Sequence, residues 1–102
     1  MFNFGKRSKE KLEQVIEPLK KTAIAALSLN LMDFSVIEGI RSKEKQDEYF
    51  KSGKSKLKWP NSSHNVKSPN EKSRAMDIVP FVNGKISWKK EHCLVLAGII
   101  LA

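Results

Sequence analysis

"DFSVIEGIRSKEKQDEYFKSG", residues 33–53, contains the clearest succession of structural elements in the chain. Its first part is rich in β-branched and aromatic residues and stops at Gly39, which predicts a strand from Phe34 to about Glu38. Ser42 can cap a helix over residues 43–52, because a serine oxygen accepts from free backbone N–H groups. Gly53 then supplies the φ freedom that a helix C-terminus needs. The middle of the fold is therefore expected to be a strand followed by a helix.

Two helices are expected before this strand. Ser8 can cap a first helix running to about Val15, and Pro18 suits the first turn of a second helix running to about Leu29. One apolar stripe continues across both helices, and it predicts a buried core face. Its members are Leu12, Val15, Ile16, Leu19, Ala23, Ala26 and Leu27.

Residues 54–73 are almost wholly polar and contain two prolines, which predicts a long loop. A loop of this length in a small domain is usually functional. "RAMDIVPF", residues 74–81, is expected to resume as a strand, with Asn83 and Gly84 forming a turn and "ISW" pairing back as a hairpin. A helix apolar nearly all round is expected after Trp88, and no later element is present to cover it, so we expect a chain cut short.

The composition indicates one globular domain, residues 1–102, since 40% of the residues are hydrophobic and 29% are charged. Nineteen Lys and Arg against eleven Asp and Glu give a net charge of +8, which should attract nucleic acid, anionic lipid or acidic wall polymers. Charge alone does not choose among these partners. No nucleic-acid-binding motif accompanies the lysines, so no dedicated nucleic-acid role is expected.

Cys93 is the single cysteine, which excludes an internal disulfide, and it is expected to be a small buried hydrophobic residue. The basic N-terminus is not followed by an apolar segment of the kind found in secretory signals. The apolar end "CLVLAGIILA" is shorter than the about 20 residues that a membrane span needs. We therefore expect synthesis in the cytoplasm without a signal peptide or a membrane span.

His64 and Asp77 are the leading candidates for chemistry, because imidazole and carboxylate groups are both good zinc donors. A catalytic zinc normally takes three protein ligands, so the pair is incomplete. The alternative is a loop histidine beside a solvent-facing or turn-capping aspartate. On these two residues alone, that alternative is the commoner outcome.

"SSH" and "SRAMDIVP", residues 62–64 and 73–80, resemble the S-x-H…A-x-D signature of the zinc DD-peptidases and phage L-alanyl-D-glutamate endopeptidases. Ser62, His64, Ala75 and Asp77 fill its four positions, and a Pro-Asn-Glu-Lys insertion lengthens the loop between them. "VIEGIRSKEKQDEYFKSGKS", residues 36–55, is similar to the family's E-G-x-R…Q…G-x-S segment. "DIVPFVNGKISW" matches the stretch that follows the aspartate. The resemblance covers nearly the whole chain.

The resemblance implies a small α+β domain of the hedgehog type, in which an antiparallel sheet carries the site and helices pack behind it. It implies zinc (Zn²⁺) held by His64 and Asp77, and a role for Arg41 in binding substrate or transition state. Gln46 and Ser62 are expected to support the site or contact substrate. The alternative for Arg41 is a surface ion pair with Glu38 or Glu44.

The family's third zinc ligand and its acidic base come from a segment after the final helix, so we expect weak zinc binding and little hydrolysis from a truncated copy. His92 could replace the missing ligand, but it aligns with a non-ligand part of the family and is not expected to bind metal. The implied activity is that of an L-alanyl-D-glutamate endopeptidase or a D-Ala-D-Ala carboxypeptidase acting on peptidoglycan stem peptides after release to the wall. The alternative is a non-catalytic remnant that binds wall peptides or self-associates through its exposed C-terminal helix.

Overall fold

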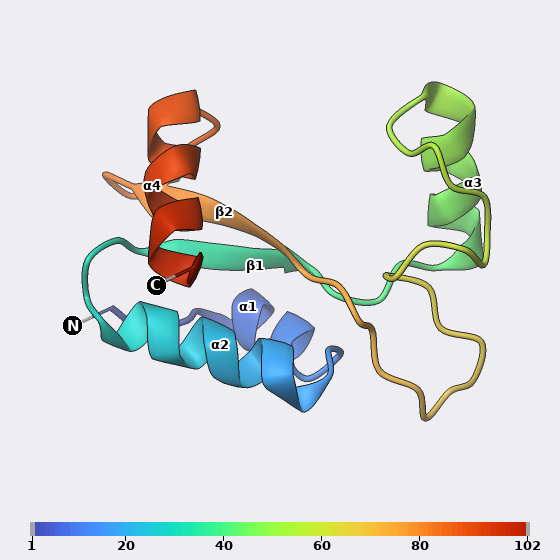
Figure 1. The fold of residues 1–102 in the computed structure, drawn as a ribbon, viewed down its shortest axis with the longest axis horizontal. Helices are drawn as coiled ribbons and strands as arrows, with labels where there is room; N and C mark the ends of the chain where they lie inside the picture. Colours follow the sequence, from blue (N-terminus) through green and yellow to red (C-terminus); the bar gives the residue numbers. More distant parts are fainter. Residues whose placement is uncertain (1, 102) are drawn as a thin grey trace.

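A computed structural model describes residues 2–101. Along this part of the chain the order is α1 (Lys6–Leu12), α2 (Glu17–Ser28), β1 (Phe34–Glu38), α3 (Lys43–Ser52), β2 (Asp77–Val82), β3 (Lys85–Ile86) and α4 (Lys90–Leu101). Helices α1, α2 and α4 gather around the strands, whereas α3 and the loop after it form a lobe to one side (Figure 1). The expected α+β class is confirmed.

The three strands form one antiparallel sheet in the order β1-β2-β3. Phe34 of β1 lies opposite Pro80 of β2, and Glu38 lies opposite Asp77 after a register shift between Val36 and Glu38. The turn between β2 and β3 has positive φ at Asn83 (54°) and Gly84 (79°), as predicted. This register sets two carboxylates side by side at the end of the sheet.

The core lies between the sheet and the helices α1, α2 and α4. Phe34 and Val36 of β1 are 1% and 2% exposed, and the edge of the Phe4 ring packs on Phe34 with 5.4 Å between ring centroids. Most of the predicted apolar stripe is buried there, which confirms its structural role. The buried members of this core cluster are Leu12, Ala23, Ala26, Leu27, Phe34, Val36, Leu96 and Ile99.

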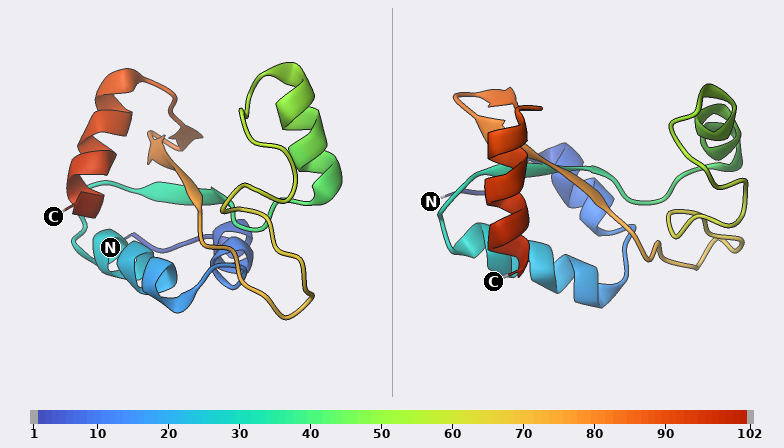
Figure 2. Two further views of the ribbon diagram at one scale, coloured as in Figure 1. Left: turned by 45° about the vertical axis from the view of Figure 1, so that its right-hand side comes forward. Right: turned by 45° about the horizontal axis from the view of Figure 1, so that its top comes forward.

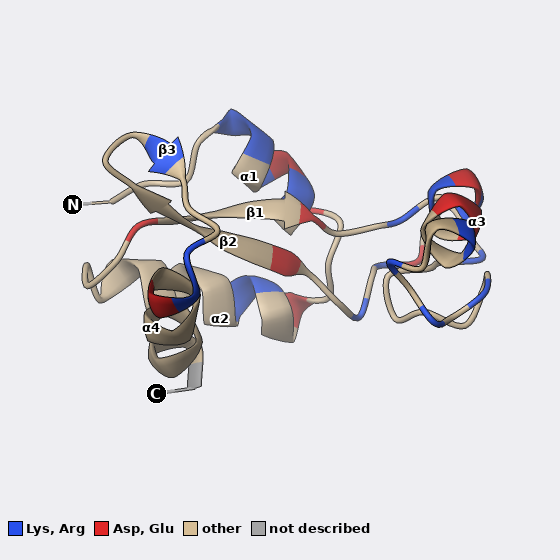
Figure 3. Ribbon diagram, turned by 90° about the horizontal axis from the view of Figure 1, so that it is seen from above, with Lys and Arg blue, Asp and Glu red and all other residues tan. Residues whose placement is uncertain are grey.

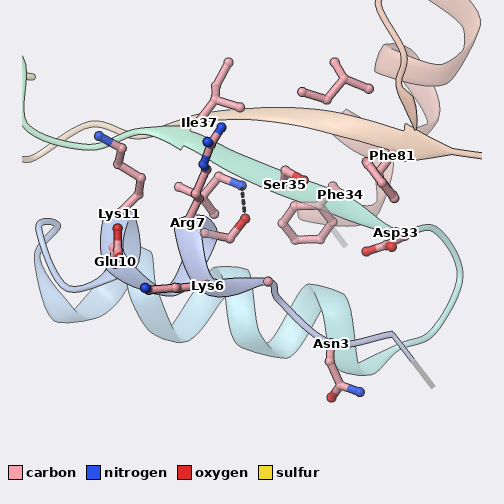
Figure 4. Close-up of a pocket in the computed structure, with 14 residues that line it drawn as sticks. Asn3, Lys6, Arg7, Glu10, Lys11, Asp33, Phe34, Ser35, Ile37 and Phe81 are labelled. Carbon is pink, nitrogen blue, oxygen red and sulfur yellow. Dashed lines mark hydrogen bonds between the residues drawn. The ribbon is translucent and has the colours of Figure 1, made fainter. Parts of the chain in front are cut away.

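Helix α1 differs from its prediction, because it begins at Lys6 after Gly5 and encloses Ser8. Ser8 is buried and its Oγ accepts a hydrogen bond from the backbone N–H of Val36 at 3.0 Å. It therefore satisfies a donor of the edge strand β1 rather than a donor of its own helix. A pocket of about 880 Å³ lies between α1 and β1, and no residue of the candidate site lines it. Figure 4 shows residues of α1 and β1 that line this pocket.

The strands β2 and β3 are shorter than predicted. Residues 73–76 lie in the loop because Arg74 donates its backbone N–H to the Ser63 carbonyl (3.0 Å) and the Ser73 hydroxyl donates to the Ala75 carbonyl (2.6 Å). β3 ends at Ile86, and Ser87 donates its backbone N–H to Pro80 at 2.8 Å. The hydrogen bonds of residues 73–76 thus stay within the loop, whereas Ser87 is still bonded to β2 just beyond the end of β3.

Helix α4 is buried on one side only. Leu96 and Ile99 are buried in the core, whereas Leu94 is 61% exposed and Val95 is 52% exposed. Cys93 is half-buried rather than buried, since it lies on the side of α4 turned partly to solvent. Within residues 2–101, no helix is both long and apolar enough to cross a membrane.

Candidate metal centre

The candidate site lies where the end of β1 meets the start of β2. Glu38 and Asp77 come together there through the register shift of the sheet, and the loop after α3 adds His64. One ligand atom from each of these three residues lies within 4.8 Å of the others. The structure thus brings together the His64 and Asp77 that the sequence singles out, and it adds Glu38.

Two ring contacts fix the orientation of His64, which is buried. Its Nδ1 lies 2.8 Å from the carbonyl oxygen of Gly39. Since a carbonyl can only accept, Nδ1 carries the hydrogen, and Nε2 is left as the lone-pair nitrogen of the neutral ring. Nε2 lies 3.4 Å from Oδ1 of Asp77. This is the arrangement of a metal-binding histidine whose far nitrogen is held by a backbone carbonyl.

The backbone of the loop is hydrogen-bonded to the segment after β1. Arg41 donates its N–H to the His64 carbonyl at 2.8 Å, and the His64 N–H donates to Oγ of the buried Ser62 at 3.2 Å. On its other side Gly39 packs closely against α1, because a Cβ there would lie 2.9 Å from the Lys11 carbonyl oxygen. The position of His64 is therefore set by the chain on both sides.

Arg41 is buried beside the carboxylates. Its Nε donates to Oε1 of Glu38 at 2.8 Å, and Nη2 donates to the same oxygen at 2.5 Å. Nη2 also lies 3.6 Å from Oδ2 of Asp77, and the guanidinium carbon lies 4.8 Å from the centroid of the Tyr49 ring. The ion pair between Arg41 and Glu38 that the sequence offered as an alternative is present. It is a buried pair inside the site rather than a surface pair.

Gln46 is completely buried and uses both ends of its amide. Oε1 accepts from Arg41 Nη1 at 2.9 Å and from Asn65 Nδ2 at 3.2 Å. Nε2 donates to the Leu57 carbonyl at 2.6 Å and to Ser55 Oγ at 3.1 Å. This one side chain connects α3, the loop and the guanidinium of Arg41.

The charges of the site shift two pKa values. Contact with Asp77, with a smaller contribution from the Gly39 carbonyl, raises the pKa of His64 above its usual value, although burial and Arg41 oppose this. Contact with His64, assisted by the Arg41 charge, lowers the pKa of Asp77. The metal-free pair therefore favours a protonated imidazole beside an ionised carboxylate.

Residues 1–101 match the model of a protein family described as phage L-alanyl-D-glutamate peptidase. The chain belongs to this family. The L-alanyl-D-glutamate peptidase of Escherichia phage T5 is 37% identical to it over 87 residues, which cover 85% of this chain and 60% of that protein. The chain thus spans about 60% of the length of this curated relative.

Among solved structures, the crystal structure of the L-Ala D-Glu endopeptidase ChiX of Serratia marcescens has a TM-score of 0.75 to this fold. The two chains are 28% identical, and the match covers 97% of this chain and 69% of that chain. The expected family and fold are confirmed by these matches.

The donor set of the candidate site suits a metal at two positions. His64 Nε2 and the half-exposed carboxylate of Asp77 are nitrogen and oxygen donors of the kind that zinc takes. Glu38 is the third donor of the cluster and its second oxygen donor, but its Oε1 already accepts two hydrogen bonds from Arg41. His92 lies outside the cluster, and its Nδ1 is 2.6 Å from Ser87 Oγ.

Sequence reasoning missed two groups that hold this site. The Gly39 carbonyl orients His64, and Asn65 links Gln46 to the Arg41 carbonyl at 3.4 Å. A carbonyl has no sequence signal of its own, and Asn65 stands in a run of polar loop residues. The one available hint was position, since Asn65 directly follows His64.

Proposed function

We propose that this chain acts as a peptidoglycan peptidase that cleaves the L-alanyl-D-glutamate bond of the stem peptide. The observation that carries the proposal is the geometry of His64, whose Nδ1 is held by Gly39 while Nε2 faces Asp77. A histidine held in this way is ready to bind a metal through Nε2. Membership of the phage peptidase family supports the choice of bond.

In this proposal His64 and Asp77 hold a zinc ion, which supplies a Lewis acid and an activated water for hydrolysis. Arg41 binds a carboxylate or a developing negative charge of the substrate. Three of the five N–H groups of its guanidinium are in hydrogen bonds to Glu38 and Gln46, so these two residues fix its direction. Ser62 and Gln46 act on the site through the loop and do not touch substrate. The protein would act at the cell wall after release from the cell that makes it.

The test is digestion of purified sacculi by the zinc-loaded chain, followed by mass spectrometry of the released peptides. We expect products with a newly exposed amino group on D-glutamate. The reaction should be slow, because the described residues offer two metal donors that are free of other strong contacts. Titration calorimetry with zinc gives the metal affinity independently of turnover.

His64→Ala and His92→Ala form a matched pair for this test, because each removes one imidazole. We expect the first to abolish zinc binding and product formation and the second to preserve both. Retention on sacculi without any new amino group would contradict the peptidase proposal and indicate a wall-binding module. Equal loss in the two variants would contradict the assignment of His64.

A further inference from the structure

Positive charge is concentrated in the lobe formed by α3 and the loop after it. Residues 51–74 contain seven Lys and Arg and a single acidic residue, Glu71, which gives a net charge of +6 against +8 for the whole chain. Figure 3 shows basic residues on the loop after α3, and both basic and acidic residues on α3 itself. Outside residues 51–74 the chain is nearly balanced in charge, so the loop after α3, with the end of that helix, is the positive pole of the molecule.

Five exposed lysines of this lobe form what we call the lysine surface: Lys45, Lys51, Lys54, Lys56 and Lys58. Among the residues described, none of the five forms an ion pair, whereas Lys43 on the same helix pairs with Asp47 at 2.8 Å. The Nζ atoms of Lys54 and Lys58 lie 5.2 Å and 5.1 Å from the ring centroids of Tyr49 and Phe50. The aromatic rings position these amines without neutralising them.

Apolar side chains lie among these lysines. Leu57 is 48% exposed and Phe50 is 38% exposed. Hydrogen bonds hold the backbone of Leu57 on both sides. Its N–H donates to Ser55 Oγ at 3.1 Å, and its carbonyl accepts from the buried Gln46. The fold therefore holds an apolar side chain toward solvent between Lys56 and Lys58.

We propose that the lysine surface docks reversibly on membranes that contain anionic phospholipids, with Leu57 entering the headgroup layer. A bilayer surface offers both properties that this surface matches, negative phosphate groups and an adjoining apolar layer. A single-stranded nucleic acid would instead need free aromatic faces for its bases. The faces of Tyr49 and Phe50 are already occupied by cations. The proposal is independent of peptidase activity.

The experiment is co-sedimentation of the 102-residue chain with vesicles of phosphatidylglycerol mixed with phosphatidylcholine, compared with pure phosphatidylcholine. Binding to the anionic vesicles alone is expected. It should weaken when salt rises from about 0.1 M to about 1 M, since the screening length falls from about 10 Å to about 3 Å. The triple variant Lys54→Gln, Lys56→Gln, Lys58→Gln should bind at least about tenfold more weakly.

The matched control is Lys85→Gln, Lys89→Gln, Lys90→Gln, which removes three exposed lysines from β3, the connection after it and the start of α4. It should bind almost as well as the parent, and circular dichroism shows whether each variant is folded. Leu57→Ser should weaken vesicle binding while leaving binding to inorganic polyphosphate unchanged. Equal losses in the two triple variants would overturn the proposal, because bulk charge would then explain binding. Absence of binding to the anionic vesicles would also overturn it. So would a combined result in which the lysines are needed for binding to polyphosphate or duplex DNA and Leu57→Ser has no effect on vesicle binding.

Discussion

His64 and Asp77 make the stability of the metal-free protein depend on pH. The raised pKa of His64 means that its contribution is fully present below its unfolded pKa of about 6.5 and is lost as the pH rises through the folded value. The lowered pKa of Asp77 means that its contribution is present above its unfolded pKa of about 3.9 and is lost as the pH falls through the folded value. Both contributions are therefore present together between about pH 4 and pH 6.5.

Asp77→Asn should remove this dependence. We expect it to lower the free energy of unfolding by about 1 kcal/mol or less near pH 5.5, since the carboxylate is half-exposed and screened by water, and to have less effect near pH 8.5. Urea unfolding at the two pH values measures the difference, and a nuclear magnetic resonance titration should show the pKa of His64 falling. His92→Gln is the control. An unchanged His64 titration in Asp77→Asn would contradict the pairing.

Gln46 is the residue whose loss should cost most stability in the site. Gln46→Ala leaves the Leu57 carbonyl and one N–H of Arg41 without partners in a buried region, so we expect a loss of about 3 kcal/mol. Glu48→Ala, on an exposed position of the same helix, should change stability by less than about 0.5 kcal/mol. Chemical unfolding of the two variants checks this, and a small effect of Gln46→Ala would show that water or a neighbour replaces its bonds.

The residues of this site differ in how clearly the sequence indicates them. His64 and Asp77 were recognisable because a family signature contains them and because imidazole and carboxylate side chains are good metal donors. The Gly39 carbonyl and Asn65 act through contacts between segments 25 and 24 residues apart. Such contacts depend on the packing of the loop against the sheet end, which no local pattern encodes.

Helix α3 ends at Gly53, where the backbone conformation favours glycine. Gly53 has φ of 84°, a conformation costly for residues with a Cβ, whereas Gly98 lies inside α4 with nothing within 4 Å of an added Cβ. Gly53→Ala should therefore lower the free energy of unfolding by about 1 kcal/mol. Gly98→Ala should raise it by about 0.5–1 kcal/mol through helix propensity. Thermal unfolding of the two variants compares the signs, and a shift in the same direction would contradict this account.

The predicted elements were accurate where their ends carry local signals. The strand Phe34–Glu38 and the helix after Ser42 have the predicted bounds, because Gly39, the Ser42 cap and Gly53 define them through nearby hydrogen bonds and φ angles. The start of β2 was placed too early, because residues 74–76 have strand-like composition but are hydrogen-bonded to the loop. Ser8 was misassigned for a similar reason, since its partner Val36 is 28 residues away.

In the whole molecule, the candidate metal centre lies where two structurally different parts meet. One part is the sheet with α1, α2 and α4, and the other is the lobe of α3 and its loop; further views show the same separation (Figure 2). The α+β class and the antiparallel sheet followed from the family resemblance, and the hairpin of β2 and β3 followed from its turn residues. The way in which Gln46 and Gly39 join the lobe to the sheet required the structure. Metal binding at this junction should therefore stabilise both parts together.

Zinc should raise the unfolding temperature of the chain through His64. A ligand that binds only the folded state at ten times its Kd adds about 1.4 kcal/mol, which corresponds to a shift of several degrees for a domain of this size. The shift should shrink as the pH falls below the His64 pKa, because protons compete with zinc for the imidazole and the raised pKa strengthens that competition. Differential scanning fluorimetry across zinc concentrations measures it, with His64→Ala expected to show no shift and His92→Ala the parent's shift. An equal zinc-induced shift in His64→Ala would move the metal away from the junction and remove the structural basis of the proposed peptidase.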